Sequence, residues 1–219
     1  MKILVLQSSP RLDGNTAHLV TLAESSLKAS AASLGEPLEI ETIHLVSMKI
    51  QYCAGCRICF DKGESFCPHK DDLPSIKAKM KESDGLLLAG PVFVDDVNAI
   101  MKNWIDRLAH VCHRPEFWRK TAVSLASTGK TPARHALRTM RIALWTWGYR
   151  IVGAAWFPMG ARMSEDETRE RYGSAVDRVA GRLVEDIRAR GFRRPSFLSL
   201  FVFRIQQAGW RKAPLDSID

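Results

Sequence analysis

The sequence predicts an α/β protein in which helices cover both faces of a doubly wound parallel sheet. Along its 219 residues, short apolar runs typical of strands alternate five times with longer segments of helical periodicity. The runs at 3–6 and 86–89 contain no polar residue, as in strands buried on both faces. This alternation predicts parallel strands joined by right-handed crossovers.

The strands are expected at five runs of apolar or alternating residues. These runs cover residues 3–6, 38–43, 86–89, 121–126 and 151–156. The run at 38–43 alternates apolar with charged or polar residues, so it predicts a half-exposed strand near an edge of the sheet.

Helical periodicity follows each of these strands. Pro74, just behind two aspartates, is typical of a first helical turn. From Val97 to Leu108 the apolar spacing has no miss, which makes this the strongest helix signal of the chain. The last helix is expected to stop at Gly191. The helices are expected to begin near Thr16, Asp71 and Asp72, Val97, Pro132 and Tyr172.

The chain is expected to form one domain and a tail. A hydrophobic content of 46% suffices for one substantial core, which predicts a domain at 1–194. The tail at 195–219 is too apolar for a free surface segment. We expect a partner subunit of a homodimer or homotetramer to cover it, the alternative being that it packs on its own domain. Its apolar residues are Phe197, Leu198, Leu200, Phe201, Val202, Phe203 and Ile205.

Composition narrows the function classes. Met1 enters a strand almost at once, without the pattern of a signal peptide, so a cytoplasmic location is expected. No apolar stretch approaches the roughly 20 residues that span a bilayer, so no membrane span is expected. The net charge is +8, and residues 107–150 hold nine basic residues against one acid, Glu116. This stretch predicts either a solvated face or attraction to an anionic partner, but no nucleic-acid motif accompanies it.

A polar loop at 8–16 joins the first strand to the first helix. A helix start offers unpaired N–H groups and the positive end of its dipole, which together suit a phosphate. Ser9, Thr16 and Arg11 add further donors, and Gly14 permits a tight turn. The loop lacks both the Gly-Lys-Ser/Thr of a Walker loop and the three glycines of a dinucleotide fingerprint. An ordinary capped turn is the alternative.

This loop resembles the Ser-x-Arg-x-x-Gly-Asn-Thr phosphate loop of flavodoxin-like NADPH-dependent FMN reductases and the related iron-sulfur flavoproteins. Residues 90–93 (Gly-Pro-Val-Phe) resemble the family's loop at the flavin ring, although Phe93 lacks the usual hydroxyl. Lys102, Asp106 and Arg107 resemble conserved positions of the helix that follows. The resemblance implies a flavodoxin-like strand order 2-1-3-4-5, with FMN beyond the carboxyl ends of the strands.

The resemblance also implies the residues that hold FMN. Loops 8–16, 90–98 and 127–130 should meet at one edge of the sheet, the first at the phosphate and the others at the ring. Asp95 and Asp96 would oppose negative charge on a reduced ring. No general acid or base is assigned, because the flavin carries the hard chemistry. The expected cofactor-binding residues are Ser9, Arg11, Asn15, Thr16, Pro91, Val92, Phe93, Ser127, Thr128 and Gly129.

Four of the five cysteines lie in a loop at 50–70, inserted after the second strand. Their spacing, Cys53-x₂-Cys56-x₂-Cys59-x₇-Cys67, resembles the compact motif by which iron-sulfur flavoproteins hold a [4Fe-4S] cluster. Zinc is a second alternative, with four thiolates or with three plus His69. A loop without metal is the third, because similar flavin-only reductases keep related cysteines.

Other residues of interest are assigned structural roles. Cys112 is expected to be an inert buried thiol. His110 and His113 are expected to sit at a helix end, where a cation favours the dipole. Asp95 or Asp96 is a candidate helix cap. Core packing is expected for Trp104, Trp145, Trp147 and Trp156.

The sequence therefore predicts an FMN-dependent oxidoreductase that passes electrons from NAD(P)H to a small-molecule or protein acceptor, with or without a [4Fe-4S] cluster. One alternative is a non-catalytic iron-sulfur flavoprotein that carries electrons. The other is a zinc-stabilised binding module without flavin. The pattern identifies neither the acceptor nor the choice between NADH and NADPH.

Overall fold

The computed structural model describes residues 1–113, 116–189, 197, 200–201, 204–205 and 207–208. The chain divides into two compact units, Met1–Arg188 and Ala189–Asp219. The predicted stop at Gly191 and most of the predicted tail at 195–219 lie outside the described residues. The tail residues that are described are helical, and its packing on a partner subunit stays a prediction.

Five parallel strands form the sheet of the first unit, in the order β2-β1-β3-β5-β6. Numbered along the chain, these strands have the predicted order 2-1-3-4-5, and β2 lies at an edge as its alternating pattern predicted. The strands are β1 (Lys2–Gln7), β2 (Glu39–His44), β3 (Gly85–Phe93), β5 (Thr121–Thr128) and β6 (Arg150–Pro158).

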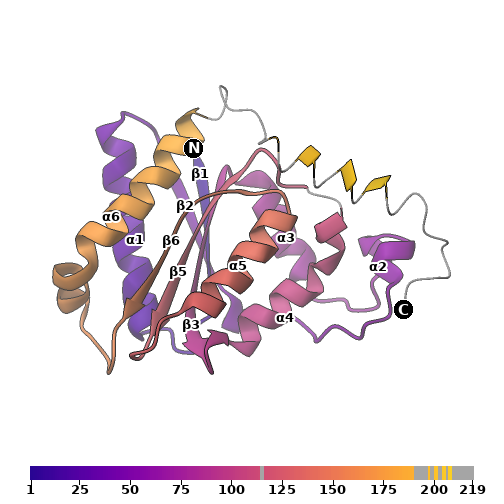
Figure 1. Cartoon of the computed structure of the whole chain (residues 1–219), viewed down its shortest axis with the longest axis horizontal. Coiled ribbons are helices and arrows are strands. Elements are labelled where there is room, and N and C mark those ends of the chain that lie inside the picture. The colour runs from indigo at the N-terminus through magenta and orange to yellow at the C-terminus, as the bar shows by residue number, and fades with distance from the viewer. Residues whose placement is uncertain (114–115, 190–196, 198–199, 202–203, 206, 209–219) are drawn as a thin grey trace. The chain divides into compact units, whose positions relative to one another are not determined.

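Helices cover both faces of this sheet (Figure 1). α1 and α6 pack on one face, and α3, α4 and α5 pack on the other. Leu4 and Leu6 of β1 face the second group, whereas Ile3 and Val5 face the first, as the two-residue period of a strand requires. The helices are α1 (Asn15–Ser33), α2 (Ile58–Asp61), α3 (Leu73–Glu82), α4 (Ala99–Arg107), α5 (Arg134–Thr146) and α6 (Glu165–Ala189).

A short hairpin after β3 corrects the predicted start of α4. Val97 belongs to a two-residue strand, β4 (Asp96–Val97), which pairs antiparallel with the end of β3. The helix begins two residues later, at Ala99. Its cap is Asn98, whose side chain accepts from the backbone N–H of Met101 at 3.1 Å. The prediction that Asp95 or Asp96 caps a helix was therefore wrong.

The turn of this hairpin is strained. Val94 and Asp95 both have positive φ, +49° and +68°, as in a type I′ turn, which normally uses asparagine and glycine. Contacts from α5 hold the turn: His135 Nδ1 lies 2.6 Å from a carboxylate oxygen of Asp95. Thr139 donates to Asp96 at 3.1 Å. Both aspartates thus point toward α5 and are engaged there.

The tryptophans divide into two classes. Trp104 and Trp147 are fully buried and meet edge to face, with ring centroids 5.1 Å apart. Trp145 and Trp156 are 42% and 38% exposed, so the expectation of core packing was wrong for them. Trp145 lies on the outer side of α5, and Trp156 lies on the edge strand β6, where a residue has a neighbouring strand on one side only.

None of the helices among the described residues combines the length and the apolar character needed to cross a membrane.

Candidate functional site

A cavity of about 220 Å³ opens at the carboxyl ends of the strands. All ten residues predicted to bind the cofactor line it, from the loop after β1, the start of α1 and the carboxyl ends of β3 and β5. The topology thus brings together three loops that are far apart in sequence. Pro10, Gly14 and Gly160 also line the cavity. Gly160 was missed, although its position just past the fifth parallel strand is a signal for it.

The N-terminus of α1 forms one end of the cavity. Its N-cap is Gly14, and no side chain of the described residues caps the helix there, so first-turn N–H groups remain for an anion. Ser9 Oγ accepts from the N–H of Arg11 at 3.1 Å and donates to its carbonyl at 2.8 Å, which closes the turn. A Cβ on Gly14 would lie 3.3 Å from Cβ of Arg11, which is a tight contact, so the glycine gives this arginine room beside the helix start.

Two polar residues of α1 tie this end together. The Thr16 and Ser127 hydroxyls are 2.7 Å apart and buried, which joins α1 to the end of β5. The Asn15 side chain donates to the carbonyl of Ala161 and accepts from the N–H of Met163, both at 2.9 Å. Its side-chain amide thus holds the connection after β6. Of the predicted donors to a phosphate, Asn15 therefore has its side chain engaged with the segment after β6.

The opposite wall of the cavity is apolar. Pro91 and Val92 are half-buried and Phe93 is 49% exposed at the rim. Behind this wall, Gly90 has no room for a side chain, because a Cβ would lie 2.7 Å from the buried hydroxyl of Ser8. Donors at one end and a flat apolar wall at the other suit a phosphate-bearing aromatic cofactor such as FMN.

The loop at 50–70, which we call the cysteine loop, carries four free thiols. Cys53 and Cys56 are exposed, and Cys59 and Cys67 are half-buried. Burial raises the pKa of Cys59, and nearby Cys53, Cys67 and Cys56 raise it further by their negative charge. Cys59 therefore lies near each of the other three thiols of the cysteine loop.

The spacing of these thiols bears on the choice of metal. Tetrahedral zinc with bonds of about 2.3 Å brings thiolate sulfurs within roughly 4 Å of one another. Within the described parts of the chain, the only group of three or more candidate ligands that all lie within 4.8 Å is Glu64, His110 and Glu116. The thiols thus stand farther apart than a closed zinc site requires. His69, the predicted alternative to a fourth thiolate, has its Nδ1 at 3.2 Å from the side-chain oxygen of Gln51.

Glu64, His110 and Glu116 surround an ammonium group. Lys77 Nζ donates to Glu64 and, at 2.8 Å, to Glu116, and it lies 3.2 Å from His110 Nε2. The Lys77 side chain is only 6% exposed, and its ammonium group is the cation that the two glutamates contact. We call these four residues the lysine anchor. It ties Glu64 of the cysteine loop to α3 and to the segment after α4.

The lysine anchor corrects the prediction for His110. Burial and the charge of Lys77 lower the pKa of His110, so its neutral form is favoured. It is thus no cation at a helix end. The side chain of His113 lies outside the described residues.

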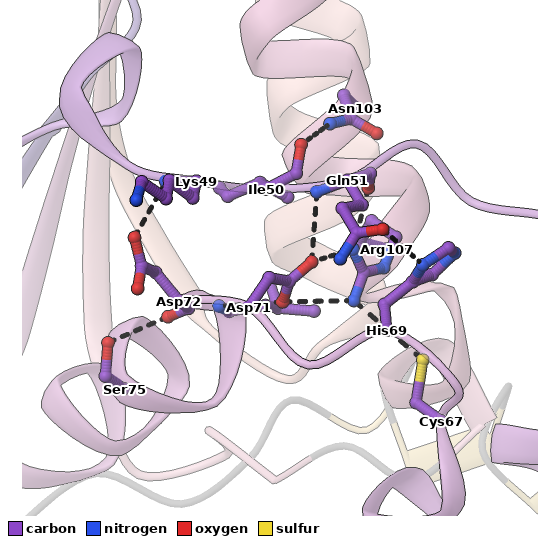
Figure 2. Close-up of polar contacts among 11 residues, drawn as sticks. Lys49, Ile50, Gln51, Cys67, His69, Asp71, Asp72, Ser75, Asn103 and Arg107 are labelled. Carbon is purple, nitrogen blue, oxygen red and sulfur yellow. Dashed lines mark hydrogen bonds and ion pairs between the residues drawn. The ribbon is translucent and has the colours of Figure 1, made fainter.

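A second buried ion pair lies beneath the cysteine loop, between Asp71 and Arg107 (Figure 2). Their closest N–O distance is 2.5 Å, and their side chains are 2% and 3% exposed. The neighbouring Lys102 and Asp106 pair on the exposed side of α4, at 2.6 Å. The sequence offered no reason to expect a role for Arg107 in the cysteine loop. The one pointer to it was its place in the helix that resembles the family's Lys and Asp-Arg positions.

Two further predictions concern the surface around the site. Cys112 is half-buried rather than buried, and its sulfur accepts from the Thr146 hydroxyl at 3.3 Å. Glu116, the acid of the basic stretch at 107–150, forms ion pairs with Lys77 and, at 2.7 Å, with Lys81. Both lysines lie outside this stretch. The exposed arginines of α5 are Arg134, Arg138 and Arg141.

Residues 1–163 match the model of a family described as NADPH-dependent FMN reductase. The chain belongs to this family. Membership supports an FMN-dependent oxidoreductase, and it confirms the resemblance seen in the phosphate loop. The match spans α1, the cysteine loop and all five parallel strands.

Curated relatives of the chain are named iron-sulfur flavoproteins. One from Archaeoglobus fulgidus is 36% identical over 158 residues, which are 71% of this chain and 67% of that protein. One from Methanocaldococcus jannaschii is 39% identical over 107 residues. That match covers 49% of this chain and 51% of that protein, so the chain spans about half of the second relative.

Solved structures share the fold. A crystal structure of RosB with a bound riboflavin-phosphate intermediate has a TM-score of 0.70 at 15% identity, covering 100% of this chain and 90% of that one. A flavone reductase has a TM-score of 0.69 at 15% identity, covering 90% and 66%. A flavodoxin from Archaea has a TM-score of 0.53 at 12% identity, covering 86% and 99%. These confirm the predicted flavodoxin-like α/β fold.

Proposed function

We propose that this protein is an FMN-dependent oxidoreductase that passes electrons from NAD(P)H, through FMN and a [4Fe-4S] cluster held by the cysteine loop, to a small-molecule or protein acceptor. The observation that carries the proposal is the cavity at the carboxyl edge of the sheet. Its thirteen lining residues include all ten that the sequence predicted for FMN.

In this proposal one part of the cavity binds the FMN phosphate and another part binds the flavin ring. The open start of α1, Arg11 and the hydroxyl of Thr16 bind the FMN phosphate through charge-assisted hydrogen bonds. Ser9 shapes the turn, because its hydroxyl already donates to the carbonyl of Arg11. Pro91, Val92 and Phe93 flank the ring, and the segment 127–129 approaches its polar edge. Bound FMN supplies hydride acceptance and onward electron transfer, and the protein orients it.

For the cysteine loop, two observations support a cluster. The other three thiols of the loop lie near Cys59, and the relatives carry the name iron-sulfur flavoprotein. Cys53, Cys56, Cys59 and Cys67 would be its ligands. We also propose that the active form is a homodimer or homotetramer, because flavin sites of related reductases often lie at subunit interfaces.

An anaerobic preparation tests both cofactors at once. We expect a flavin spectrum, FMN in the denatured supernatant, and iron with acid-labile sulfide near the content of one cluster per chain. Absence of FMN would overturn the proposal. Zinc without sulfide would remove the cluster and leave the flavin enzyme. Anaerobic NADH and NADPH should each be tried, since bleaching of the flavin by either identifies a reductase, whereas no bleaching identifies an electron carrier.

The phosphate cradle has its own test. Arg11→Ala combined with Thr16→Ala should weaken FMN binding without unfolding the chain, because Arg11 lies on the surface. Isothermal titration of the apoprotein with FMN measures the change. Arg162→Ala is the control, because this exposed arginine pairs with Asp13 and does not line the cavity. Equal FMN affinity of the double variant and the wild type would show that the phosphate lies elsewhere.

A further inference from the structure

Arg107 is a buried cation in direct reach of one of the cysteine sulfurs. It ends α4, and its side chain is 3% exposed. One guanidinium nitrogen donates to the carbonyl of Gln51 at 2.7 Å and to Asp71 at 2.5 Å. The other donates to Asp71 at 3.3 Å and to the sulfur of Cys67 at 3.8 Å. Figure 2 shows this fork between the two ends of the cysteine loop.

Asp71 completes the arrangement from the other side. Its carboxylate accepts from the N–H of Gln51 at 3.0 Å and from the N–H of Leu73 at 3.2 Å, besides its bonds from Arg107. Gln51 precedes the first cysteine and Asp71 follows the last. The pair Asp71–Arg107 therefore joins the two ends of the cysteine loop, one at Gln51 and the other at Asp71. Beside it, Asn103 donates to the carbonyl of Ile50 at 3.0 Å (Figure 2).

The pair is charged in spite of its burial. A guanidinium group keeps its proton in proteins. The carboxylate of Asp71 lies 2.5 Å from it and also accepts from two backbone N–H groups, as an ionised carboxylate does. A positive charge thus stands beside Cys67 with little water to screen it.

We propose that Arg107 is a positioning residue of the cysteine centre, which holds Cys67 by its hydrogen bond and raises the reduction potential of the cluster bound there. The inference rests on the proposed function for the presence of the cluster. It goes beyond that function by assigning one residue the control of the potential.

The direction follows from charge. A cluster held by these thiols would gain one negative charge on taking up an electron from reduced FMN, with no bond to Cys67 formed or broken. A buried cation and a donor at a ligand sulfur stabilise the more negative state, which raises the potential. Asp71 opposes this effect by its own negative charge. Changes at the two partners should therefore shift the potential in opposite directions, which a purely structural role does not predict.

A redox titration followed by electron paramagnetic resonance tests the proposal on the holoprotein. We expect the midpoint potential to fall in Arg107→Gln, to fall less in Arg107→Lys, and to rise in Asp71→Asn. Arg57→Gln is the matched control, because Arg57 lies within the cysteine loop but pairs with Asp61 at 3.4 Å. Its potential should change less than that of Arg107→Gln, because water screens the more exposed charge of Arg57.

Iron and sulfide content is measured for every variant. Loss of the cluster from folded Arg107→Gln, but not from Arg57→Gln, would support the holding role, and the potential is then read in the Arg107→Lys and Asp71→Asn variants. Full clusters with a wild-type potential in Arg107→Gln, or shifts of the same sign at Arg107 and Asp71, would overturn the inference. A wild-type protein without iron and sulfide would instead overturn the cluster of the proposed function.

Discussion

The FMN cavity and the cysteine loop are built in different ways. The cavity is made by topology: strands of one parallel sheet end at one edge, and the loops after them meet there. The cysteine loop has little regular structure, one short helix and one 3₁₀ turn. Two buried ionic groups attach it to the domain, namely the pair Asp71–Arg107 and the lysine anchor.

This difference has an energetic consequence. A loop that follows a buried strand is held in position by the hydrophobic core around that strand. Single polar substitutions at the surface leave this core intact. A loop held by buried ions depends on each partner, because removal of one leaves the other charged and desolvated. Substitutions should therefore damage the cysteine loop more than the cavity.

The largest effect is expected from Asp71→Ala. It leaves the Arg107 guanidinium buried without its carboxylate, which costs about 3–5 kcal/mol. Thermal unfolding measures the loss, and faster labelling of the thiols by a chromogenic disulfide reports the opening of the cysteine loop. Asp61→Ala is the control, because its pair with Arg57 is exposed and such pairs contribute about 0–1 kcal/mol. Equal losses in the two variants would show that Asp71–Arg107 does not hold the loop.

A smaller loss is expected when the wall of the FMN cavity is overpacked. In Gly90→Ala the new methyl group would lie 2.7 Å from the Ser8 hydroxyl and 3.3 Å from Met140. Overpacking of this kind costs about 1–3 kcal/mol, which denaturant unfolding measures. Gly173→Ala is the matched control, since a Cβ there meets nothing within 4 Å. A loss in the control as large as that in Gly90→Ala would contradict the close approach of Ser8.

The bond between α1 and β5 should matter for cofactor binding rather than for the fold. Thr16→Val keeps the shape but leaves the buried Ser127 hydroxyl without its partner, a cost of about 1–2 kcal/mol. If this free-energy cost weakens the FMN-bound form relative to the apoprotein, the dissociation constant of FMN rises about tenfold. Titration of the apoprotein measures it, with Thr21→Val on the exposed side of α1 as control. An unchanged constant in Thr16→Val would place this bond outside FMN binding.

The smallest effect is expected from pH and acts on the lysine anchor. The pKa of His110 is lowered from its usual 6.5. The unfolded chain therefore takes up a proton first, and stability falls as the pH drops through about 6.5. Hydrogen bonds from Lys77 likewise lower the pKa of Glu64 and Glu116 against their burial, so further stability is lost below 4.5.

Urea unfolding between about pH 8 and pH 5 measures the first of these steps. In His110→Gln this part of the pH dependence should disappear. In His135→Gln it should persist, because His135 is 65% exposed and lies on α5. An identical slope in wild type and His110→Gln would mean that His110 does not titrate within the lysine anchor.

Local pattern was sufficient to predict most of the residues that line the cavity. Alternation of strand and helix implies a parallel sheet, and a parallel sheet has one edge at which its carboxyl ends meet. Each loop residue at such an end is therefore a neighbour of the others, whatever their separation in sequence. Gly160 escaped prediction because it has no chemistry of its own to mark it. The role of the Asn15 side chain escaped because its partners lie on the connection after β6.

Side-chain environments were predicted less well. His110 has the sequence context of a helix-end cation, yet a lysine from another helix and two glutamates make it a buried neutral group. Trp145 is only two residues from the buried Trp147 and is just as apolar, but its side chain lies on the exposed side of α5. Arg107 is charged like its exposed neighbours, and only its burial against Asp71 sets it apart.

The sequence alone therefore determined the fold class, the order of the parallel strands, the family and the edge at which the cofactor residues gather. These depend on periodicity and on short motifs, which are local. The tertiary structure decided which charges are buried, what partners them and how the cysteine loop is attached. These depend on contacts between residues distant in sequence, since the cost of burying a charge is set by the groups that fold around it.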